Sequence, residues 1–249
     1  MDKQKAEHLY MARLAEQTER YEDMVDHMKK YISIVKELQD DERNLLSLAY
    51  KNTVTTRRTA WRAISALENK ERTKNTRQAD IIKYYKNKIE KELEFFSKDC
   101  LDLVDDLLAN ATSTESRVFY LKMQGDYNRY LAEFLQGDRF NEVSEQALKQ
   151  YKEAMAVADA KDRGLKTTDV IKLGLALNYS VFYYEIRNDA NEAVNIARKA
   201  FDDAIADLES LEEEKYKDST TIMQLLRDNI TLWTNDLPEN NEQNQAAKK

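Results

Sequence analysis

Two pairs of basic residues have a spacing that places cations on one side of a helix. Lys122 and Arg129 are seven residues apart, and Tyr130 follows directly. Lys51 and Arg58 repeat the same spacing upstream. Seven residues make about two turns at ~3.6 residues per turn. Guanidinium, ammonium and phenol groups all donate to phosphate oxygens, so two such helices packed side by side would form one basic pocket for a phosphate.

Asp126 lies between the second pair of cations, four residues after Lys122 and three before Arg129. Residues at these spacings are neighbours on a helix, so its carboxylate can pair with either cation. The alternative is an ordinary solvated face, because 34% of all residues are charged and cations seven apart arise often in helical sequences. Spacing alone leaves both interpretations open.

The composition predicts an all-α protein. The chain of 249 residues has one proline and four glycines, which leaves few turn-forming residues and favours helices joined by short connections. The formal net charge of −7 disfavours nucleic acid as a partner. The single cysteine suits a reducing compartment. The sequence shows no long apolar run and no signal peptide. We therefore expect a cytoplasmic protein, with the nucleus left open as a second location.

Apolar residues recur every three or four positions in nine stretches, which predicts an antiparallel array of nine helices. The expected helices cover residues 3–18, a second stretch ending near 36, 40–67, 82–107, 117–134, 140–158, 173–186, 194–208 and 219–233. A polar connector is expected over 69–80, and the division is a single helical domain at 1–235 followed by a disordered polar tail at 236–249.

Local signals suggest where several helices begin and end. Asp40 or Asp41 would cap the third helix, and Ser219 or Asp218 the ninth. Thr112 with Glu115 fits a capping box that opens the fifth helix, and Gly137 fits its end.

Enzyme chemistry is poorly supported by the residues present. The scattered glycines cannot form a phosphate-binding loop. His8 and His27 lack the glutamates that a di-iron bundle places three residues earlier. Cys100 falls on an apolar stripe, which favours a core residue over a nucleophile. We therefore expect no enzymatic activity, no metal and no cofactor.

A peptide-binding surface is better supported by the seventh and ninth helices. Asn178 and Asn229 each carry an amide that can donate to and accept from a peptide backbone. Apolar residues nearby could form a wall beside them, namely Leu177, Val181, Ile222, Leu225 and Leu232. The alternative is that both asparagines are ordinary polar positions on helix surfaces.

Several long segments resemble the signature segments of the 14-3-3 family, in the same order and spacing. They are RNLLSLAYKN, RRTAWR, SRVFYLKMQGDYNRYLAE, LGLALNYSVFYYEI and YKDSTTIMQLLRDNITLWT. The similarity covers about Leu14 to Trp233. It implies nine-helix protomers that pair as homodimers or heterodimers with a paralogue through their N-terminal helices, each with an amphipathic groove for phosphoserine or phosphothreonine peptides.

The resemblance also assigns roles to individual residues. Phosphate binding falls on Lys51, Arg58, Arg129 and Tyr130, and backbone contacts on Asn178 and Asn229. The apolar wall falls on the five residues named above, and Lys122, Asp126, Glu185 and Trp233 line the remaining groove. Dimer contacts fall on Leu14, Thr18, Ile64 and Tyr85, with ion pairs from Arg20 to Glu92 and from Asp23 to Lys88.

The sequence therefore predicts an adaptor that binds phosphorylated client proteins and modulates their activity, localisation or assembly. The rival interpretation is a helical-repeat scaffold that binds unmodified peptides.

Overall fold

The computed structural model describes residues 2–35, 37–71, 77–211 and 213–237. Every regular element within these ranges is helical, which confirms the prediction of an all-α protein. None of the helices described has both the length and the apolar character that crossing a membrane requires. The helices form two compact units, Met1–Ala111 and Thr112–Lys249, and the single domain predicted over residues 1–235 stays a prediction.

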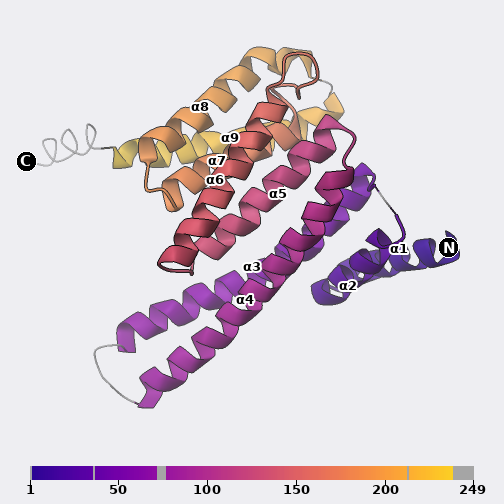
Figure 1. Ribbon diagram of the computed structural model, residues 1–249. Helices are drawn as coiled ribbons and strands as arrows, with labels where there is room; N and C mark the ends of the chain where they lie inside the picture. The colour runs from indigo at the N-terminus through magenta and orange to yellow at the C-terminus, as the bar shows by residue number, and fades with distance from the viewer. Residues whose placement is uncertain (1, 36, 72–76, 212, 238–249) are drawn as a thin grey trace, which may run out of the picture. The chain divides into compact units, whose positions relative to one another are not determined.

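The first unit holds four helices, each packed on the next in the chain (Figure 1). They are α1 (Asp2–Gln17), α2 (Tyr21–Ile32), α3 (Asp40–Glu71) and α4 (Arg77–Asn110). The stripe predicted along α4 faces inward at Leu93, Cys100 and Val104, all of which are buried. Cys100 is thus a core residue, as its position on the stripe indicated.

The second unit holds the remaining helices, in which α5 packs mainly on α6, and α7 contacts both α8 and α9 (Figure 1). Their bounds are α5 (Thr114–Ala132), α6 (Asp138–Ala158), α7 (Val170–Glu185), α8 (Ala190–Asp207), the 3-10 turn η1 (Leu208–Ser210) and α9 (Glu213–Asp236). Of the apolar positions predicted for α5, Val118, Leu121 and Leu131 are buried. The α7–α9 core includes Leu173, Leu226 and Trp233.

One predicted boundary is wrong because charged residues here continue a helix rather than end it. The connector expected over 69–80 is shorter, since α3 continues to Glu71 and α4 begins at Arg77. Glutamate, lysine and arginine are good helix formers, and no glycine or proline interrupts this stretch. The last helix runs to Asp236, and residues 238–249 of the predicted tail lie outside the described residues, so the tail stays a prediction.

Several predicted caps are also wrong. Ser113, not Thr112, caps α5, and its hydroxyl accepts a 3.0 Å hydrogen bond from the Ser116 amide. Asp40 and Asp41 are already helical, and the Gln39 carbonyl accepts from the Arg43 amide at 2.9 Å. Neighbouring residues with similar capping ability compete for the position, and tertiary packing decides between them.

Gly137 and Ser219 have roles that the sequence did not indicate. Gly137 precedes α6 rather than ending α5, and its φ of 61° with ψ of −140° is a conformation that favours glycine. Ser219 and Asp218 lie inside α9, which begins at Glu213. The buried Ser219 hydroxyl instead donates a 2.7 Å hydrogen bond to the Thr168 carbonyl just before α7.

Candidate functional site

In the first unit, the predicted phosphate-binding residues Lys51 and Arg58 lie on α3. This helix is unbroken from Asp40 to Glu71, so Lys51 and Arg58 lie two turns apart on one side of it. Lys51 is exposed and Arg58 is half-buried. The neighbouring Arg57 is directed elsewhere: its guanidinium binds Glu92 on α4 at 2.9 Å and Glu22 on α2 at 2.6 Å. Arg57 therefore has a structural role, since it links α3 to α2 and α4.

In the second unit, the carboxylate of Asp126 organises the predicted cations of α5. Oδ2 lies 2.7 Å from Nζ of Lys122, and Oδ1 lies 3.5 Å from the Arg129 guanidinium. Oδ1 also accepts a 2.6 Å hydrogen bond from the Tyr151 hydroxyl of α6. The amide of Asn178 on α7 donates to both oxygens, at 2.8 and 3.0 Å. One carboxylate thus joins three helices.

The electrostatics of this cluster leave it positively charged. Burial by itself would raise the pKa of Asp126, but the charges of Lys122 and Arg129 outweigh burial and hold the pKa below its ordinary value. Asp126 is therefore ionised at neutral pH. Two cations and one carboxylate leave one net positive charge, which favours a bound anion.

Arg129 is held in place by the residues around it. Its Nε donates a 3.2 Å hydrogen bond to the Tyr151 hydroxyl, and its guanidinium carbon lies 4.7 Å from the centre of the Tyr130 ring. Arg129 is 5% exposed, whereas Tyr130 is half-buried. These contacts limit the conformations of the arginine, so little conformational entropy remains to be lost when an anion binds.

Tyr151 is the residue that the sequence interpretation missed. Its place on the apolar stripe of α6 indicated a core position, and it is fully buried. A buried tyrosine needs a partner for its hydroxyl, which was the available signal. Its ring lies against Gly125 of α5, where a Cβ would come within 2.7 Å of the ring. Glycine at this position allows the close approach that brings the Tyr151 hydroxyl to Asp126.

The hydrogen bonds of Asn178 determine which part of its amide remains available. Nδ2 lies within hydrogen-bond distance of both oxygens of the Asp126 carboxylate, a bifurcated contact made by one N–H group, and the amide keeps its carbonyl oxygen as an acceptor. The half-buried Asn178 can therefore accept a hydrogen bond from a backbone N–H of a bound peptide. Asn229 on α9 is also half-buried.

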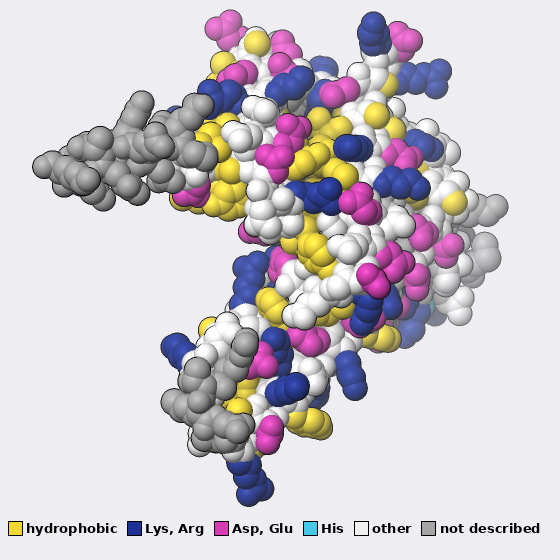
Figure 2. Space-filling view, turned by 60° about the vertical axis from the view of Figure 1, so that its left-hand side comes forward, with side chains coloured by type: hydrophobic (Ala, Val, Ile, Leu, Met, Phe, Trp, Pro, Cys, Tyr) yellow, Lys and Arg dark blue, Asp and Glu magenta, His cyan; other side chains and the backbone are white. Residues whose placement is uncertain are grey.

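The predicted apolar wall lies on α7 and α9, which pack against each other. Leu177, Val181 and Ile222 are half-buried against the core, whereas Leu225 and Leu232 are 48% and 58% exposed. Leu225 and Leu232 are seven residues apart on α9, so they lie on the same side of that helix. Figure 2 shows hydrophobic side chains gathered in patches between interspersed acidic and basic ones on the visible face.

Two further predicted groove residues differ in exposure. Glu185 is exposed at the end of α7. Trp233 is 3% exposed and stacks on Tyr184, with ring centres 4.9 Å apart. Trp233 thus belongs to the core behind the wall rather than to the exposed surface of a groove.

The residues predicted for a dimer lie on or next to α1, α2, α3 and α4. Tyr85 is 52% exposed, and Leu14 and Ile64 are half-buried. Thr18 is exposed, and its hydroxyl donates to the Leu14 carbonyl at 2.9 Å. Within the chain Arg20 pairs with Asp23, Glu92 pairs with Arg57, and Lys88 is exposed. The ion pairs of Arg20 with Glu92 and of Asp23 with Lys88 across a dimer stay predictions.

No group of three or more histidine, cysteine or acidic residues with the arrangement of a metal site occurs in the part of the chain that the structure describes. In the second unit the Asp126 carboxylate instead binds protein groups, from Lys122, Arg129, Tyr151 and Asn178.

Comparison with known proteins places the chain among relatives of similar length. The family model described as 14-3-3 protein matches residues 11–234. The chain is 54% identical over 230 residues to the checkpoint signal transducer rad24 of Schizosaccharomyces pombe, covering 92% of this chain and 84% of the relative. It is 50% identical over 248 residues to Protein BMH2 of Saccharomyces cerevisiae, covering 98% and 90%. It is 50% identical over 251 residues to 14-3-3 protein 7 of Solanum lycopersicum, covering 100% and 98%.

Proposed function

The chain belongs to the 14-3-3 family of adaptor proteins, and on that premise we propose that it binds phosphoserine and phosphothreonine motifs in client proteins. The observation that carries the proposal is the Asp126 cluster, which holds Lys122 and Arg129 in defined positions with one net positive charge. Arg129 and Tyr130, together with Lys51 and Arg58 of α3, would grip the phosphate.

The chemistry of these residues suits a phosphate ester. Such a group carries about −1.5 to −2 charges at pH 7, and each charge-assisted hydrogen bond contributes roughly 1.5–3 kcal/mol. The carbonyl of Asn178 and the amide of Asn229 would bind the peptide backbone, and the wall of Leu177, Val181, Ile222, Leu225 and Leu232 would contact its side chains. Affinity then depends on both the phosphate and the apolar residues that follow it.

A titration of one peptide with and without its phosphate tests the proposal by fluorescence anisotropy. We expect binding only with the phosphate, because the unmodified serine offers nothing to neutralise the cations. Equal binding of both forms would instead support the scaffold that binds unmodified peptides.

Removing the phosphate grip gives the second arm of this test. Arg58→Ala and Arg129→Ala together should abolish phosphopeptide binding while circular dichroism shows the helical content intact. Arg198→Ala removes an exposed cation of α8 and is the matched control. Affinity retained in the double variant would show that the phosphate binds elsewhere.

We also propose that the protein is a dimer through α1 and the partner's α3 and α4. Leu14, Ile64 and the half-exposed Tyr85 would supply most of the association, since exposed ion pairs contribute only ~0–1 kcal/mol each. A dimer would bind a doubly phosphorylated client with a gain on the order of 10²–10⁴. Leu14→Glu with Ile64→Glu should yield monomers that still bind a singly phosphorylated peptide. Light scattering that shows the unmodified protein monomeric at micromolar concentration would contradict this interface.

A further inference from the structure

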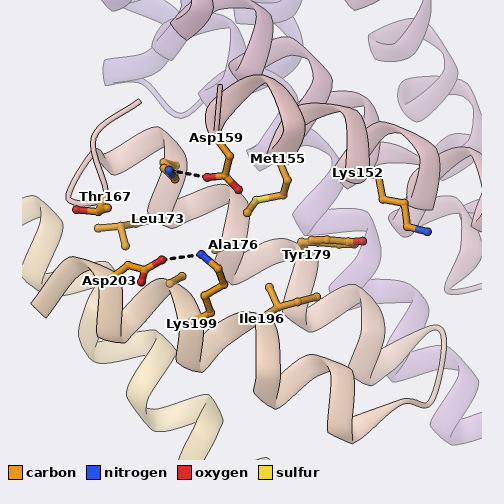
Figure 3. A pocket seen from close by; sticks show the side chains of 12 residues that line it. Lys152, Met155, Asp159, Thr167, Leu173, Ala176, Tyr179, Ile196, Lys199 and Asp203 are labelled. Carbon is orange, nitrogen blue, oxygen red and sulfur yellow. Dashed lines mark hydrogen bonds and ion pairs between the residues drawn. The ribbon is translucent and has the colours of Figure 1, made fainter. Parts of the chain in front are cut away.

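We propose that a pocket between α6, α7 and α8 is a second binding site, for a small apolar molecule that carries one carboxylate. The pocket has a volume of about 200 Å³ and lies entirely within the second unit (Figure 3). It is separate from the peptide site: Leu173, Ala176 and Tyr179 of α7 line it, whereas Asn178 is bound to Asp126 on α5. The inference therefore goes beyond the proposed phosphopeptide binding.

The base of the pocket is apolar and comes from three helices. Met155 of α6, Leu173 and Ala176 of α7, and Ile196 and Ala200 of α8 line it. An apolar cavity of about 150 Å³ is large enough to hold a benzene ring. The volume here is sufficient for one aromatic ring with a short chain, and burial of that apolar group favours binding.

Charged side chains surround this base, and two of the lysines are paired. Lys172 lies 2.6 Å from Asp159, and its ammonium also donates to the carbonyls of Ala158 and Leu165 at 3.5 and 3.3 Å. Its three N–H groups are thus occupied. Lys199 lies 2.7 Å from Asp203 (Figure 3). These two ion pairs are electrically balanced and attract neither sign of ligand strongly.

Lys152 is the cation that gives the pocket its net charge. It is exposed on α6, and no hydrogen bond or ion pair joins it to the residues that the structure describes. Figure 3 shows it on the same side of the pocket as Tyr179. Three lysines and two aspartates leave one positive charge among the residues that line the pocket. An apolar ligand is therefore favoured when it carries one negative charge that can reach the Lys152 ammonium.

The test uses phenylpropionate as the probe, with phenylpropanol and phenylpropylamine as neutral and cationic analogues. Methyl NMR titrations of the full chain would follow Met155 and Ile196, which line the pocket, and Met223, which is buried in the α7–α9 core and does not. We expect the carboxylate to shift Met155 and Ile196 but not Met223, with a Kd in the millimolar range that is typical of a ligand of this size. The alcohol should bind about two- to fivefold more weakly, as expected for loss of an exposed charge pair, and the amine more weakly still.

Two variants separate the charge from the cavity. Lys152→Gln should lower the affinity for phenylpropionate about two- to fivefold and leave the affinity for phenylpropanol unchanged. Lys149→Gln lies on the same helix but outside the pocket, and it should change neither affinity. Ala200→Leu should fill the pocket and abolish binding of all three probes, and a thermal melt would show whether it folds. If it does not fold, Lys152→Gln still decides the question.

Three results would overturn the proposal: no shift at Met155 and Ile196, equal affinity for acid and alcohol, or shifts on the wall of α7 and α9. A phosphopeptide added at saturation should leave the shifts of the probe unchanged. Its displacement of the probe would place the probe in the peptide site instead. The measured shifts come from residues that line the pocket, Met155 and Ile196. A negative result would therefore exclude this second site without bearing on the proposed phosphopeptide binding.

Discussion

The hydroxyl of Tyr151 on α6 donates a 2.6 Å hydrogen bond to Oδ1 of Asp126 on α5, and both side chains are buried. The same hydroxyl accepts from Nε of Arg129 at 3.2 Å. Burial raises the pKa of Tyr151 well above its ordinary value, and the Asp126 charge raises it further. The phenol thus stays protonated and links the carboxylate to the arginine that we propose grips the phosphate.

Replacing Tyr151 with phenylalanine should weaken both folding and phosphopeptide binding. The variant keeps the ring but removes a hydrogen-bond donor to a buried carboxylate, which costs about 1–3 kcal/mol of stability. A less constrained Arg129 should lower phosphopeptide affinity by up to about tenfold, equivalent to ~1.4 kcal/mol. Denaturant unfolding and anisotropy measure the two effects. Tyr183→Phe is the control, and an affinity unchanged in Tyr151→Phe would show that the tyrosine positions nothing.

Two glycine substitutions should have opposite effects on stability. Gly125→Ala places a Cβ 2.7 Å from the Tyr151 ring, and such overpacking costs ~1–3 kcal/mol. That exceeds the ~1 kcal/mol by which alanine favours a helix over glycine. At Gly174 the nearest atom is Cε of Lys122 at 3.7 Å, an ordinary contact, so Gly174→Ala should stabilise the protein. Thermal melts that rank the two variants in the reverse order would refute the packing argument.

A carboxylate at Val181 should impair binding more than folding. Val181 is half-buried beside the α7–α9 core, and Val181→Asp puts an unpaired charge where peptide side chains would pack. We expect phosphopeptide affinity to fall more than tenfold, with a modest decrease in Tm. Ile205→Asp on α8, at a residue that is 48% exposed, should leave affinity unchanged. Complete unfolding of Val181→Asp would show that Val181 belongs to the core rather than the wall.

The contact between α1 and α2 should weaken in acid. Nδ1 of His8 and Nδ1 of His27 lie 3.3 Å apart, which requires one ring to donate and the other to accept. Burial, and then the charges of Lys30 and His8, lower the pKa of His27, while Asp23 and Asp26 oppose this. The folded state therefore binds the proton less readily than the unfolded state. The stability from this contact is present above pH ~6.5 and is lost as the pH falls below that value.

A variant without an ionisable group at position 27 tests whether His27 causes this loss of stability in acid. His27→Phe should show a smaller decrease in Tm between pH 7.5 and pH 5.5, values chosen on either side of the ordinary histidine pKa of ~6.5. The acidic groups common to both proteins cancel in this comparison. An equal decrease in the two proteins would mean that His27 does not govern the acid sensitivity.

Helical periodicity in the sequence by itself determined much of this molecule. The seven-residue spacing of Lys122 and Arg129 requires that they share a side of α5, and the position of Asp126 between them requires a short distance to both. The burial of Cys100 follows from the same periodicity on α4. These relationships depend only on the geometry of one helix, which a sequence specifies locally.

Only the tertiary structure determined which residues of one helix contact which residues of another. Tyr151 reaches Asp126 because Gly125 lets α6 approach α5 closely, and the stripe of α6 does not reveal which helix its tyrosine will meet. Serine is a favoured cap residue, so its local preference wrongly predicted that Ser219 begins the last helix. The bond of its hydroxyl to the Thr168 carbonyl exists only once α9 packs near the start of α7. Such choices depend on contacts between distant residues, and local propensities differ too little to determine them.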